Sequence, residues 1–528
     1  MNARSVIVIG AGIGGLAAAA LLAARGVDVT VLERGRSAGG KLRVHGVGGV
    51  EIDAGPTVFT MRWVFDELFA EANACLDDAL TLTPSRILAR HAWDEEAGLA
   101  RLDLPADFEA AVDAIGCFSG AADARGYREF CARAGAIHAA LEKPFLRAGR
   151  TSIPGLLWRG GLEGLPGLLR ISPFASLWPE LARHFRDPRL RQLFGRYATY
   201  CGSSPWLAPA TLMLVAHVER TGVWRIEGGM QRLAQAVESL ATRAGARFRF
   251  DAPVDEIVER AGRARGVRLS DGEVMDADAI VFNGDVNALA IGLLGAPARV
   301  GLADGARRWR ADGGRSLSAL TWSVAARTRG LPLLRHNVLF SQDYAAEFAA
   351  LSAGRLPGDP TVYVCAQDRG DDAPTVDDAA PQRLLCLVNA PATASRRPLT
   401  DREIAACENQ AFQRMARCGL LLEPVAPMRR TTPSDFATLF PGTDGALYGP
   451  PSHGWRASFQ RMGARHPLRG LYLAGGSTHP GPGVPMAALS GRLAARAICE
   501  DLLSTSSRRP AAMHGGTSTR SATTGGTA

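Results

Sequence analysis

The sequence has few of the features that mark disulfide-rich, metal-binding or membrane-spanning proteins. Its nine cysteines are scattered over 528 residues without paired or metal-ligand spacing, which predicts free thiols in a reducing cytosol and no metal site. A single long uncharged run occurs, at residues 6–24. Four glycines in its middle, and its direct continuation into a strand-like segment, argue against a membrane span or a signal sequence.

Lysine is almost absent, and charge is not concentrated anywhere. Lys41 and Lys143 are the two lysines, so the net charge of +8 is carried by arginines spread along the chain. This charge is too diffuse to predict nucleic-acid binding, although it would suit an anionic lipid surface. With 47% hydrophobic residues, the chain has enough apolar material for two or three subdomains around large cores.

The N-terminal glycine motif is typical of a dinucleotide-binding βαβ unit. A predicted strand at 6–9 leads into Gly10-x-Gly12-x-x-Gly15, a helix at 16–25 and a strand at 27–32. Gly10 permits the tight turn, Gly12 lets the backbone approach a pyrophosphate, and Gly15 allows close packing of helix on strand. Glu33 ends the second strand, where it is placed to accept hydrogen bonds from the adenosine ribose.

Two further segments decide between flavin and nicotinamide. Ser37-Ala-Gly-Gly-Lys41 and Asp53-Ala-Gly-Pro-Thr57 resemble the second fingerprint of the flavoprotein superfamily that contains amine oxidases, protoporphyrinogen oxidases and carotenoid desaturases. The resemblance implies that the cation at position 41 meets the cofactor pyrophosphate. Lys41 stands where the family usually has arginine, which exchanges a bidentate fork for a point charge.

The middle and the end of the chain carry the remaining cofactor motifs. Gly222-Val-Trp-Arg-Ile-Glu-Gly-Gly-Met230 precedes a predicted helix at 233–244, strands at 247–250, 266–269, 273–275 and 279–282, and a segment in which the resemblance implies that Val254 holds adenine through its backbone. Near the C-terminus, Leu473-Ala-Gly-Gly-Ser-Thr-His-Pro-Gly-Pro-Gly-Val-Pro485 resembles the run that closes the flavin site in bacterial-type phytoene desaturases.

These motifs together predict one FAD site on an α/β fold. The expected fold is a discontinuous Rossmann-type FAD/NAD(P)-binding domain with an α+β substrate domain, as in the flavin amine oxidase-like superfamily. The predicted cofactor contacts are Gly10, Ala11, Gly12, Gly14, Gly15, Glu33, Arg34, Gly40, Lys41, Gly55, Pro56, Thr57, Val254, Gly475, Gly476, Gly483, Val484 and Met486.

The motifs also predict how the chain is divided. Segments 1–75, 222–290 and 431–503 are expected to form the flavin domain, with 76–221 and 291–430 inserted as the substrate domain, the latter supplying a sheet. Residues 504–528 are rich in Ser, Thr and Gly and are predicted to be disordered. Residues 145–182 mix Trp158 and Trp178 with arginines, which fits either a membrane-contacting segment or the wall of a buried tunnel.

The resemblance narrows further to one branch. The segments 197–205 and 222–230 look most similar to 1-hydroxycarotenoid 3,4-desaturases, which implies an FAD-dependent enzyme that removes two hydrogens from an acyclic carotenoid. The expected partners are this substrate, a membrane surface, and an electron acceptor such as oxygen or quinone, with a cytoplasmic location at the inner membrane. The alternatives are a phytoene desaturase, a carotenoid cis-trans isomerase, a retinol saturase and, outside enzymes, a prenyl-binding escort protein.

No catalytic residue is assigned from the sequence. Glu227 could act as a base or contact a substrate hydroxyl, although a solvated loop carboxylate is the simpler interpretation. His479 could take part in chemistry or only brace its loop. Tyr197 and Tyr200 could line a substrate tunnel or pack in the core.

Overall fold

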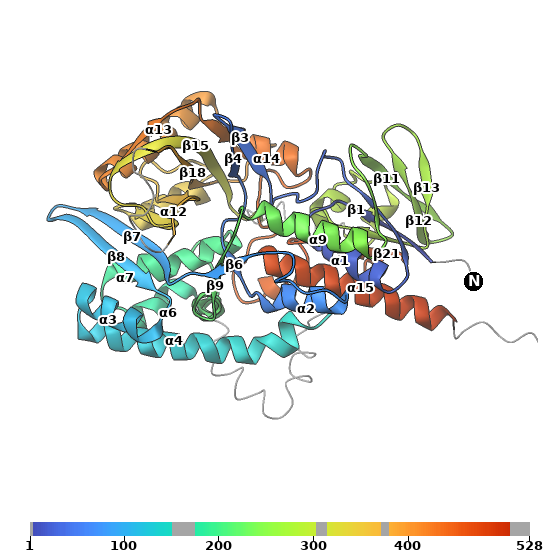
Figure 1. Cartoon of the computed structure of the whole chain (residues 1–528), viewed down its shortest axis with the longest axis horizontal. Helices are drawn as coiled ribbons and strands as arrows, with labels where there is room; N and C mark the ends of the chain where they lie inside the picture. The colour runs from blue at the N-terminus through green and yellow to red at the C-terminus, as the bar shows by residue number, and fades with distance from the viewer. Residues whose placement is uncertain (1–3, 150–174, 303–313, 371–379, 507–528) are drawn as a thin grey trace, which may run out of the picture.

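The computed structural model describes residues 4–149, 175–302, 314–370 and 380–506. Its two lobes are each built on a separate sheet (Figure 1). In the part of the chain that is described, no helix combines the length and the apolar character needed to cross a bilayer. Most of the segment 145–182 and nearly all of the tail 504–528 lie outside the described residues.

A parallel five-stranded sheet forms the first lobe and draws on three distant parts of the chain. Its strand order is β10-β2-β1-β14-β21. The bounds are β1 Ser5–Ile9, β2 Asp28–Leu32, β10 Arg247–Arg249, β14 Ala279–Phe282 and β21 Leu471–Leu473. The inner strands β1, β2 and β14 are rich in Val, Ile and Leu because both faces of this sheet are covered, whereas the edge strand β10 is Arg-Phe-Arg.

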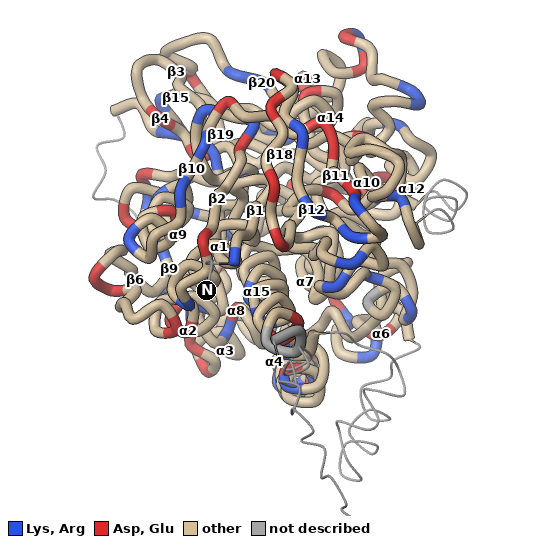
Figure 2. The backbone as a smooth tube through the Cα atoms, turned by 90° about the vertical axis from the view of Figure 1, so that its right-hand side faces the viewer, with Lys and Arg blue, Asp and Glu red and all other residues tan. Residues whose placement is uncertain are grey.

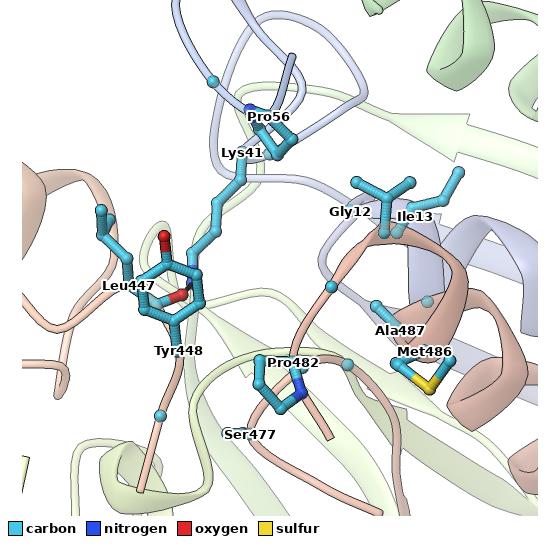
Figure 3. Close-up of a pocket in the computed structure, with 18 of the residues that line it drawn as sticks. Gly12, Ile13, Lys41, Pro56, Leu447, Tyr448, Ser477, Pro482, Met486 and Ala487 are labelled. Atoms are coloured by element: carbon cyan, nitrogen blue, oxygen red, sulfur yellow. Dashed lines mark hydrogen bonds between the residues drawn. The ribbon is translucent and has the colours of Figure 1, made fainter. Parts of the chain in front are cut away.

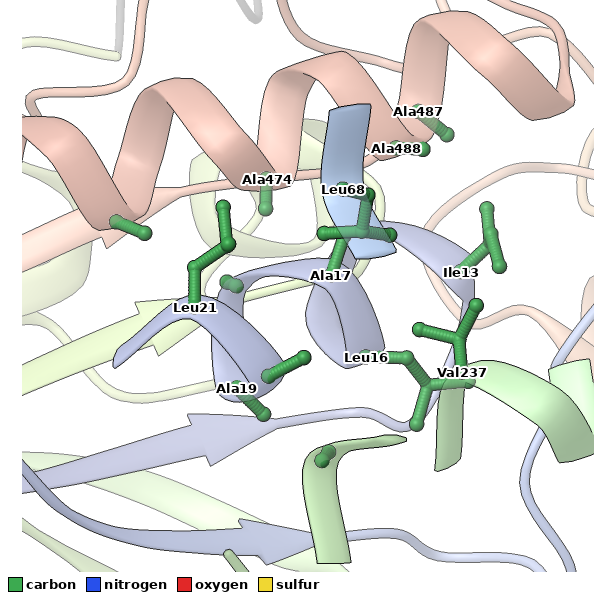
Figure 4. Packing of buried hydrophobic residues seen from close by; sticks show 14 of the residues in the cluster. Ile13, Leu16, Ala17, Ala19, Leu21, Leu68, Val237, Ala474, Ala487 and Ala488 are labelled. Carbon is green, nitrogen blue, oxygen red and sulfur yellow. The ribbon is translucent and has the colours of Figure 1, made fainter. Parts of the chain in front are cut away.

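Alternate residues of these strands enter two different cores. Val6 and Val8 point to one face, which is packed by α1 (Ile13–Ala24), α9 (Gln231–Arg243) and α15 (Val484–Ser506). Figure 4 shows α1 lying between the other two helices. Ile7 points to the opposite face, which is covered by the antiparallel strands β11 (Val254–Arg260), β12 (Arg263–Leu269) and β13 (Val274–Asp276).

The second lobe is an eight-stranded sheet covered by helices. Its main path runs β19-β15-β18-β17-β16-β7-β8, and β20 pairs with β15. The strands are β7 Ile87–Glu95, β8 Gly98–Pro105, β15 Ser318–Gly330, β16 His336–Phe340, β17 Val362–Ala366, β18 Gln382–Ala390, β19 Leu420–Pro424 and β20 Arg429–Thr431. The sequence predicted a sheet only from 291–430. The hairpin β7–β8 of the first insert extends it, because β7 pairs in parallel with β16 from the second insert.

Helices cover both faces of this sheet. One core brings together α3 (Phe108–Ser119), α4 (Ala121–Leu141), α6 (Leu177–His184), α7 (Pro188–Gly195) and α12 (Tyr344–Ser352). The other core packs α13 (Asp401–Arg417) against the strands. The smaller elements are β3 Val44–Val47, β4 Val50–Asp53, β5 Phe59–Thr60, α2 Trp63–Glu71, β6 Leu82–Pro84, η1 Glu142–Leu146, η2 Arg196–Cys201, η3 Ala210–Met213, α8 Leu214–Arg220, β9 Val223–Ile226, α10 Val286–Ala290, η4 Pro297–Arg299, α14 Pro433–Leu439 and η5 Ala457–Phe459.

Element boundaries differ from the sequence predictions in two informative places. The helix expected from residue 16 begins at Ile13, so Gly14 and Gly15 are its first turn rather than part of the preceding loop. The apolar run at 208–218 predicts a helix that could wall a substrate pocket, and the structure has there the 3₁₀ turn η3 followed by α8, after Pro209. Proline fixes φ and lacks an N–H, so it marks where a helical segment begins rather than continues.

Asp53 ties the two lobes together at the end of the hairpin β3–β4. Its side chain is buried and accepts hydrogen bonds from the backbone N–H of Met230 (2.7 Å) and of Gln231 (3.2 Å), at the start of α9. Its own backbone N–H and C=O pair with the side-chain amide of Gln367, from the second lobe, at 2.9 Å each. One residue therefore fixes the central glycine segment and the second sheet against the N-terminal segment.

Arginines and acidic residues are interspersed over the outer face of the first lobe (Figure 2). Figure 2 shows basic and acidic positions alternating along the tube, without a continuous basic stripe in that view.

Candidate functional site

A cavity of about 1550 Å³ lies between the two lobes. All three predicted cofactor segments line it, together with residues of both inserts. Ligand pockets for one small molecule usually measure about 300–1,000 Å³, so this cavity has room for a cofactor and a second molecule. Figure 3 shows the end at which the N-terminal and C-terminal glycine segments face each other.

Sixteen of the eighteen predicted cofactor residues line this cavity. They are Gly10, Gly12, Gly14, Glu33, Arg34, Gly40, Lys41, Gly55, Pro56, Thr57, Val254, Gly475, Gly476, Gly483, Val484 and Met486. Ala11 and Gly15 do not. Ala11 is fully buried, and a Cβ on Gly15 would lie 2.2 Å from the Gly10 carbonyl oxygen, so both act in packing behind the cavity wall.

The glycine loops form a cradle that has space for a ligand backbone but not for side chains. Gly12 forms a parallel bridge with Gly39, and the N–H of Gly39 donates to the carbonyl of Ala11 at 2.9 Å. Gly40 has φ +59°, and a Cβ there would lie 3.3 Å from the Cα of Gly12. Because the cavity wall here is bare backbone, the extended pyrophosphate of a dinucleotide fits against it.

Asn283 fixes the shape of this cradle, and the sequence did not single it out for that role. Its side-chain amide donates to the carbonyls of Gly10 (3.1 Å) and Gly12 (3.2 Å). It stands directly after β14, at the carboxyl end of a central strand, where ligands bind in open parallel sheets. That position was the available signal, since Asn283-Gly-Asp285 follows the predicted strand 279–282.

Two helices begin at the cavity wall and present their N-termini to it. Helix α1 begins after Gly12, whose lack of a side chain leaves the first N–H groups without a side-chain cap, and Gly12, Ile13 and Gly14 line the cavity. Helix α15 begins at Val484, and Gly483 and Met486 line the cavity beside it. A helix N-terminus carries free donors and a partial positive charge, so this end of the cavity favours an anion.

Glu33 braces the turn as well as lining the cavity. One carboxylate oxygen accepts from the N–H of Ala11 at 2.7 Å and the other from the N–H of Gly35 at 2.8 Å. Each oxygen keeps a lone pair for a further donor, so a ribose contact remains compatible with this arrangement. Beside it, Arg34 lines the cavity and donates to the carbonyl of Thr438 at 3.0 Å.

Lys41 lies on the opposite side of the cavity from the helix N-termini. Its ammonium donates to the carbonyl of Leu447 and lies 5.3 Å from the centre of the Phe440 ring. Figure 3 shows its side chain running toward Leu447 and Tyr448 rather than toward Gly12. The pyrophosphate contact expected for Lys41 therefore stays a prediction. Burial lowers the pKa of Lys41 to about 8, with Asp285 acting against this and Arg43 adding to it.

The lowered pKa of Lys41 predicts a pH dependence of stability. Below pH 8 the ammonium is charged in both folded and unfolded chains, so its burial cost is fully present. Above the ordinary pKa of 10.5 it is neutral in both. We expect the unfolding free energy of the wild type to increase relative to that of Lys41→Met as the pH rises from 8 toward 10.5, by at most about 3 kcal/mol. Urea titrations of both proteins at several pH values measure this, and parallel pH profiles would contradict it.

Of the other candidate residues from the sequence, one lines the cavity and three do not. Glu227 is exposed and does not line the cavity, so it is not placed to act on a ligand there. His479 is buried, and its Nε2 lies 2.9 Å from the carbonyls of Phe145 and Ala148, which makes it a brace between the closing loop and η1. Tyr197 is buried in the core with its hydroxyl on Glu219, whereas Tyr200 lines the cavity.

Beyond the glycine cradle the cavity becomes a mainly apolar chamber. Helices α4 and α8, the turns η2 and η3, and the strands of the second sheet supply its walls. Sequence reasoning did not find the polar residues in this part, because the fold gathers them from distant elements. The lining residues that it missed include Leu141, Arg196, Glu219, Tyr344, Tyr363, Leu385 and Tyr448. Leu212 and Val215 also line the chamber, and they belong to the apolar segment 208–218 that the sequence offers as a pocket wall. Trp178, which the sequence assigns either to a membrane-contacting segment or to a tunnel wall, stacks on Trp206 at 4.4 Å.

Known proteins resemble this chain over nearly its whole length. A family model described as flavin-containing amine oxidoreductase matches residues 13–499. Hydroxyneurosporene desaturases are 53% identical in Rubrivivax gelatinosus, covering 100% of this chain and 99% of the relative, and 45% identical in Cereibacter sphaeroides, covering 95% and 98%. A 1-hydroxycarotenoid 3,4-desaturase of a Flavobacterium species is 30% identical, covering 94% of this chain and 99% of the relative.

Solved structures agree on the fold. A wild-type putrescine oxidase bound to putrescine superposes with a TM-score of 0.60 at 15% identity, covering 94% of this chain and 99% of that one. The fold class expected from the sequence is thereby confirmed. The backbone cradle, the two helix N-termini and the size of the cavity fit the cofactor that the family name implies. This chain belongs to the flavin-containing amine oxidoreductase family, and its cofactor is FAD.

Proposed function

We propose that this protein is an FAD-dependent carotenoid desaturase that introduces a C=C bond into an acyclic carotenoid, at the 3,4 position of a 1-hydroxycarotenoid. The observation that carries the proposal is that the glycine cradle and the apolar chamber form one continuous cavity. A long apolar substrate can thus lie against a bound flavin. The 53% and 45% identity to hydroxyneurosporene desaturases supports this substrate class over others.

The residues of the chamber would act by position rather than as strong acids or nucleophiles. Aromatic and aliphatic walls bind the polyene, align the bond to be oxidised and exclude water. FAD held in the cradle would supply the two-electron oxidation, accepting a hydride from one carbon while a proton leaves its neighbour. The substrate itself lowers the barrier, because the adjoining polyene delocalises the positive charge that develops as the hydride departs.

The substrate assignment is tested with purified protein and liposomes that carry one carotenoid each. We expect 1-hydroxyneurosporene to lose one pair of hydrogens and shift its absorption to the red, with neurosporene and phytoene converted far more slowly. Chromatography with mass and absorption detection resolves the products. Rapid desaturation of phytoene would overturn the assignment in favour of a phytoene desaturase.

The same experiment separates the remaining alternatives by mass. A cis-trans isomerase would return a product of unchanged mass, a saturase would add a pair of hydrogens, and a prenyl-binding escort protein would convert none of the three. Each of these outcomes contradicts the desaturase proposal.

Glu33 gives a direct test of the flavin site. We expect Glu33→Ala to be purified with much less FAD than the wild type, because the turn loses two backbone braces and the ribose loses an acceptor. Removing hydrogen bonds to a charged group costs about 1.5–3 kcal/mol each, which corresponds to at least a tenfold weaker Kd. The ratio of flavin to protein absorbance measures it. Full yellow colour in Glu33→Ala would contradict this role. Glu33→Gln keeps one acceptor, so its flavin content should lie between those of the wild type and Glu33→Ala.

We further propose peripheral association with the cytoplasmic face of the inner membrane and re-oxidation by oxygen or a quinone. An acyclic carotenoid dissolves in lipid rather than water, so the enzyme must meet it at a bilayer. Flotation with anionic vesicles, at low and high salt, tests the association. Re-oxidation of the reduced enzyme by air, or anaerobically by a soluble quinone, identifies the acceptor.

A further inference from the structure

A compact polar cluster interrupts the apolar chamber. The guanidinium of Arg196 donates to the hydroxyl of Tyr200 at 3.0 Å and lies over two rings, 5.3 Å from the centre of Tyr200 and 5.1 Å from that of Tyr363. Glu219, which is 8% exposed, accepts from the hydroxyl of Tyr197 at 2.8 Å. Burial raises the pKa of the Glu219 carboxyl, while hydrogen bonds from Tyr197 and Tyr200 and the charge of Arg196 act against this.

The cluster stands beside the cofactor cradle. The hydroxyl of Tyr363 lies 2.7 Å from the hydroxyl of Thr57, a residue of the Asp53-Ala-Gly-Pro-Thr57 motif. The same hydroxyl lies 2.7 Å from Nδ1 of His336, which holds the ring from behind. Thr57, Arg196 and Tyr363 all line the cavity. A group bound by Arg196 would therefore be held close to the part of the chamber that faces the flavin.

Arg196 has donor capacity that the protein leaves unused. Among the described residues its side chain makes the one hydrogen bond to Tyr200 and no ion pair, although the nearby Glu219 carboxyl feels its charge. A guanidinium carries five N–H donors. Keeping such a charge in an apolar chamber is costly unless an acceptor completes its hydrogen bonding. Arg196 lines the cavity, so the oxygen of a ligand bound there can supply the acceptor that the protein does not.

We propose that Arg196, oriented by Tyr200 and Glu219, binds the hydroxyl oxygen of the substrate and so selects hydroxylated over unmodified carotenoids. This inference rests on the proposed function and names its specificity residue. In a 1-hydroxycarotenoid oxidised between carbons 3 and 4, a single carbon separates the hydroxyl-bearing carbon from the bond that reacts. The group that recognises the hydroxyl must then lie next to the cofactor cradle, and Arg196 is linked to the cradle residue Thr57 through the ring and hydroxyl of Tyr363. Binding there would set the register of the whole polyene.

Arg196→Met keeps an unbranched apolar stem and removes the guanidinium with all its donors. We expect this variant to lower kcat/KM for 1-hydroxyneurosporene on the order of 10- to 100-fold, the loss of a hydrogen bond from a charged donor, while kcat/KM for neurosporene stays the same or rises. Arg196→Lys should recover part of the loss. Quenching of tryptophan fluorescence by each carotenoid gives the two Kd values independently of turnover. In Arg196→Met the Kd for 1-hydroxyneurosporene should rise relative to the Kd for neurosporene.

The matched control is Arg189→Met, on the neighbouring helix α7 and outside the cavity lining, where the guanidinium pairs with Asp187 and Glu95. The ratio of its kcat/KM for 1-hydroxyneurosporene to its kcat/KM for neurosporene should equal that of the wild type. An equal fall in both substrates for Arg196→Met would mark a merely structural role and overturn this inference alone. Failure of the wild type to desaturate 1-hydroxyneurosporene would instead remove the proposed function.

Discussion

Replacing Gly491 with valine is expected to destabilise the protein by about 3 kcal/mol or more and to yield protein without flavin. Gly491 lies in α15 where that helix crosses α1. A Cβ at this position would stand 2.0 Å from the carbonyl oxygen of Gly14 and 3.1 Å from the backbone nitrogen of Ala18. Neither is a flexible side-chain end, so the two helices must move apart.

That movement would displace both helix N-termini that line the flavin cradle, which is why stability and cofactor content should fall together. Urea unfolding followed by tryptophan fluorescence gives the first, and flavin absorbance of the purified protein the second. Gly116→Ala in helix α3 is the control, because a Cβ there meets only the Ala124 methyl at an ordinary 3.5 Å. It should raise stability by up to about 1 kcal/mol through helix propensity. A Gly491→Val protein with wild-type stability and full flavin would refute the crossing argument.

Removing the Asp53 carboxylate should cost about 3 kcal/mol. Asp53→Ala leaves the N–H groups of Met230 and Gln231 without their acceptor at the start of α9, and each unsatisfied buried donor costs about 1–3 kcal/mol. The Asp53 carboxylate also packs closely on the central glycine segment, since a Cβ on Gly229 would lie 2.3 Å from it. Its removal therefore leaves that segment less firmly held. Denaturant midpoints measured for the wild type and the variant at equal protein concentration give the difference.

An ordinary helix cap provides the comparison. Asp107 accepts from the N–H of Ala110 at the start of α3, is exposed, and caps a helix next to it in the chain. Asp107→Ala should cost about 1 kcal/mol, the usual value for losing such a cap. Equal costs for Asp53→Ala and Asp107→Ala would show that the long-range contact adds nothing to stability.

The cofactor cradle was largely predictable because its chemistry is local. The glycines at positions 10, 12 and 40 are required by backbone conformation and close approach, and such requirements leave a mark within a few residues of sequence. The acidic residue at the end of the second strand, Glu33, carries a similar local signature. The predicted strand at 279–282 also matches the structure, because a short apolar run between polar turns is typical of a strand in a covered sheet.

The parts that sequence reasoning missed depend on residues that meet only in the folded chain. Strand β7 joins the second sheet through pairing with β16, some 250 residues away, and no local periodicity encodes that choice of partner. The direction of the Lys41 side chain, toward Leu447, was likewise hidden, since the acceptor lies more than 400 residues later.

The amino-acid sequence by itself determined the flavin fold, the position of the cradle and the resemblance to carotenoid desaturases, because backbone requirements at glycines and apolar periodicity are properties of neighbouring residues. Only the tertiary structure decided that Asp53 caps α9, that Asn283 shapes the glycine turn, and that Arg196, Glu219 and Tyr363 meet beside Thr57. Those contacts join distant segments, and their strength comes from burial, which exists only once both lobes have closed around the cavity.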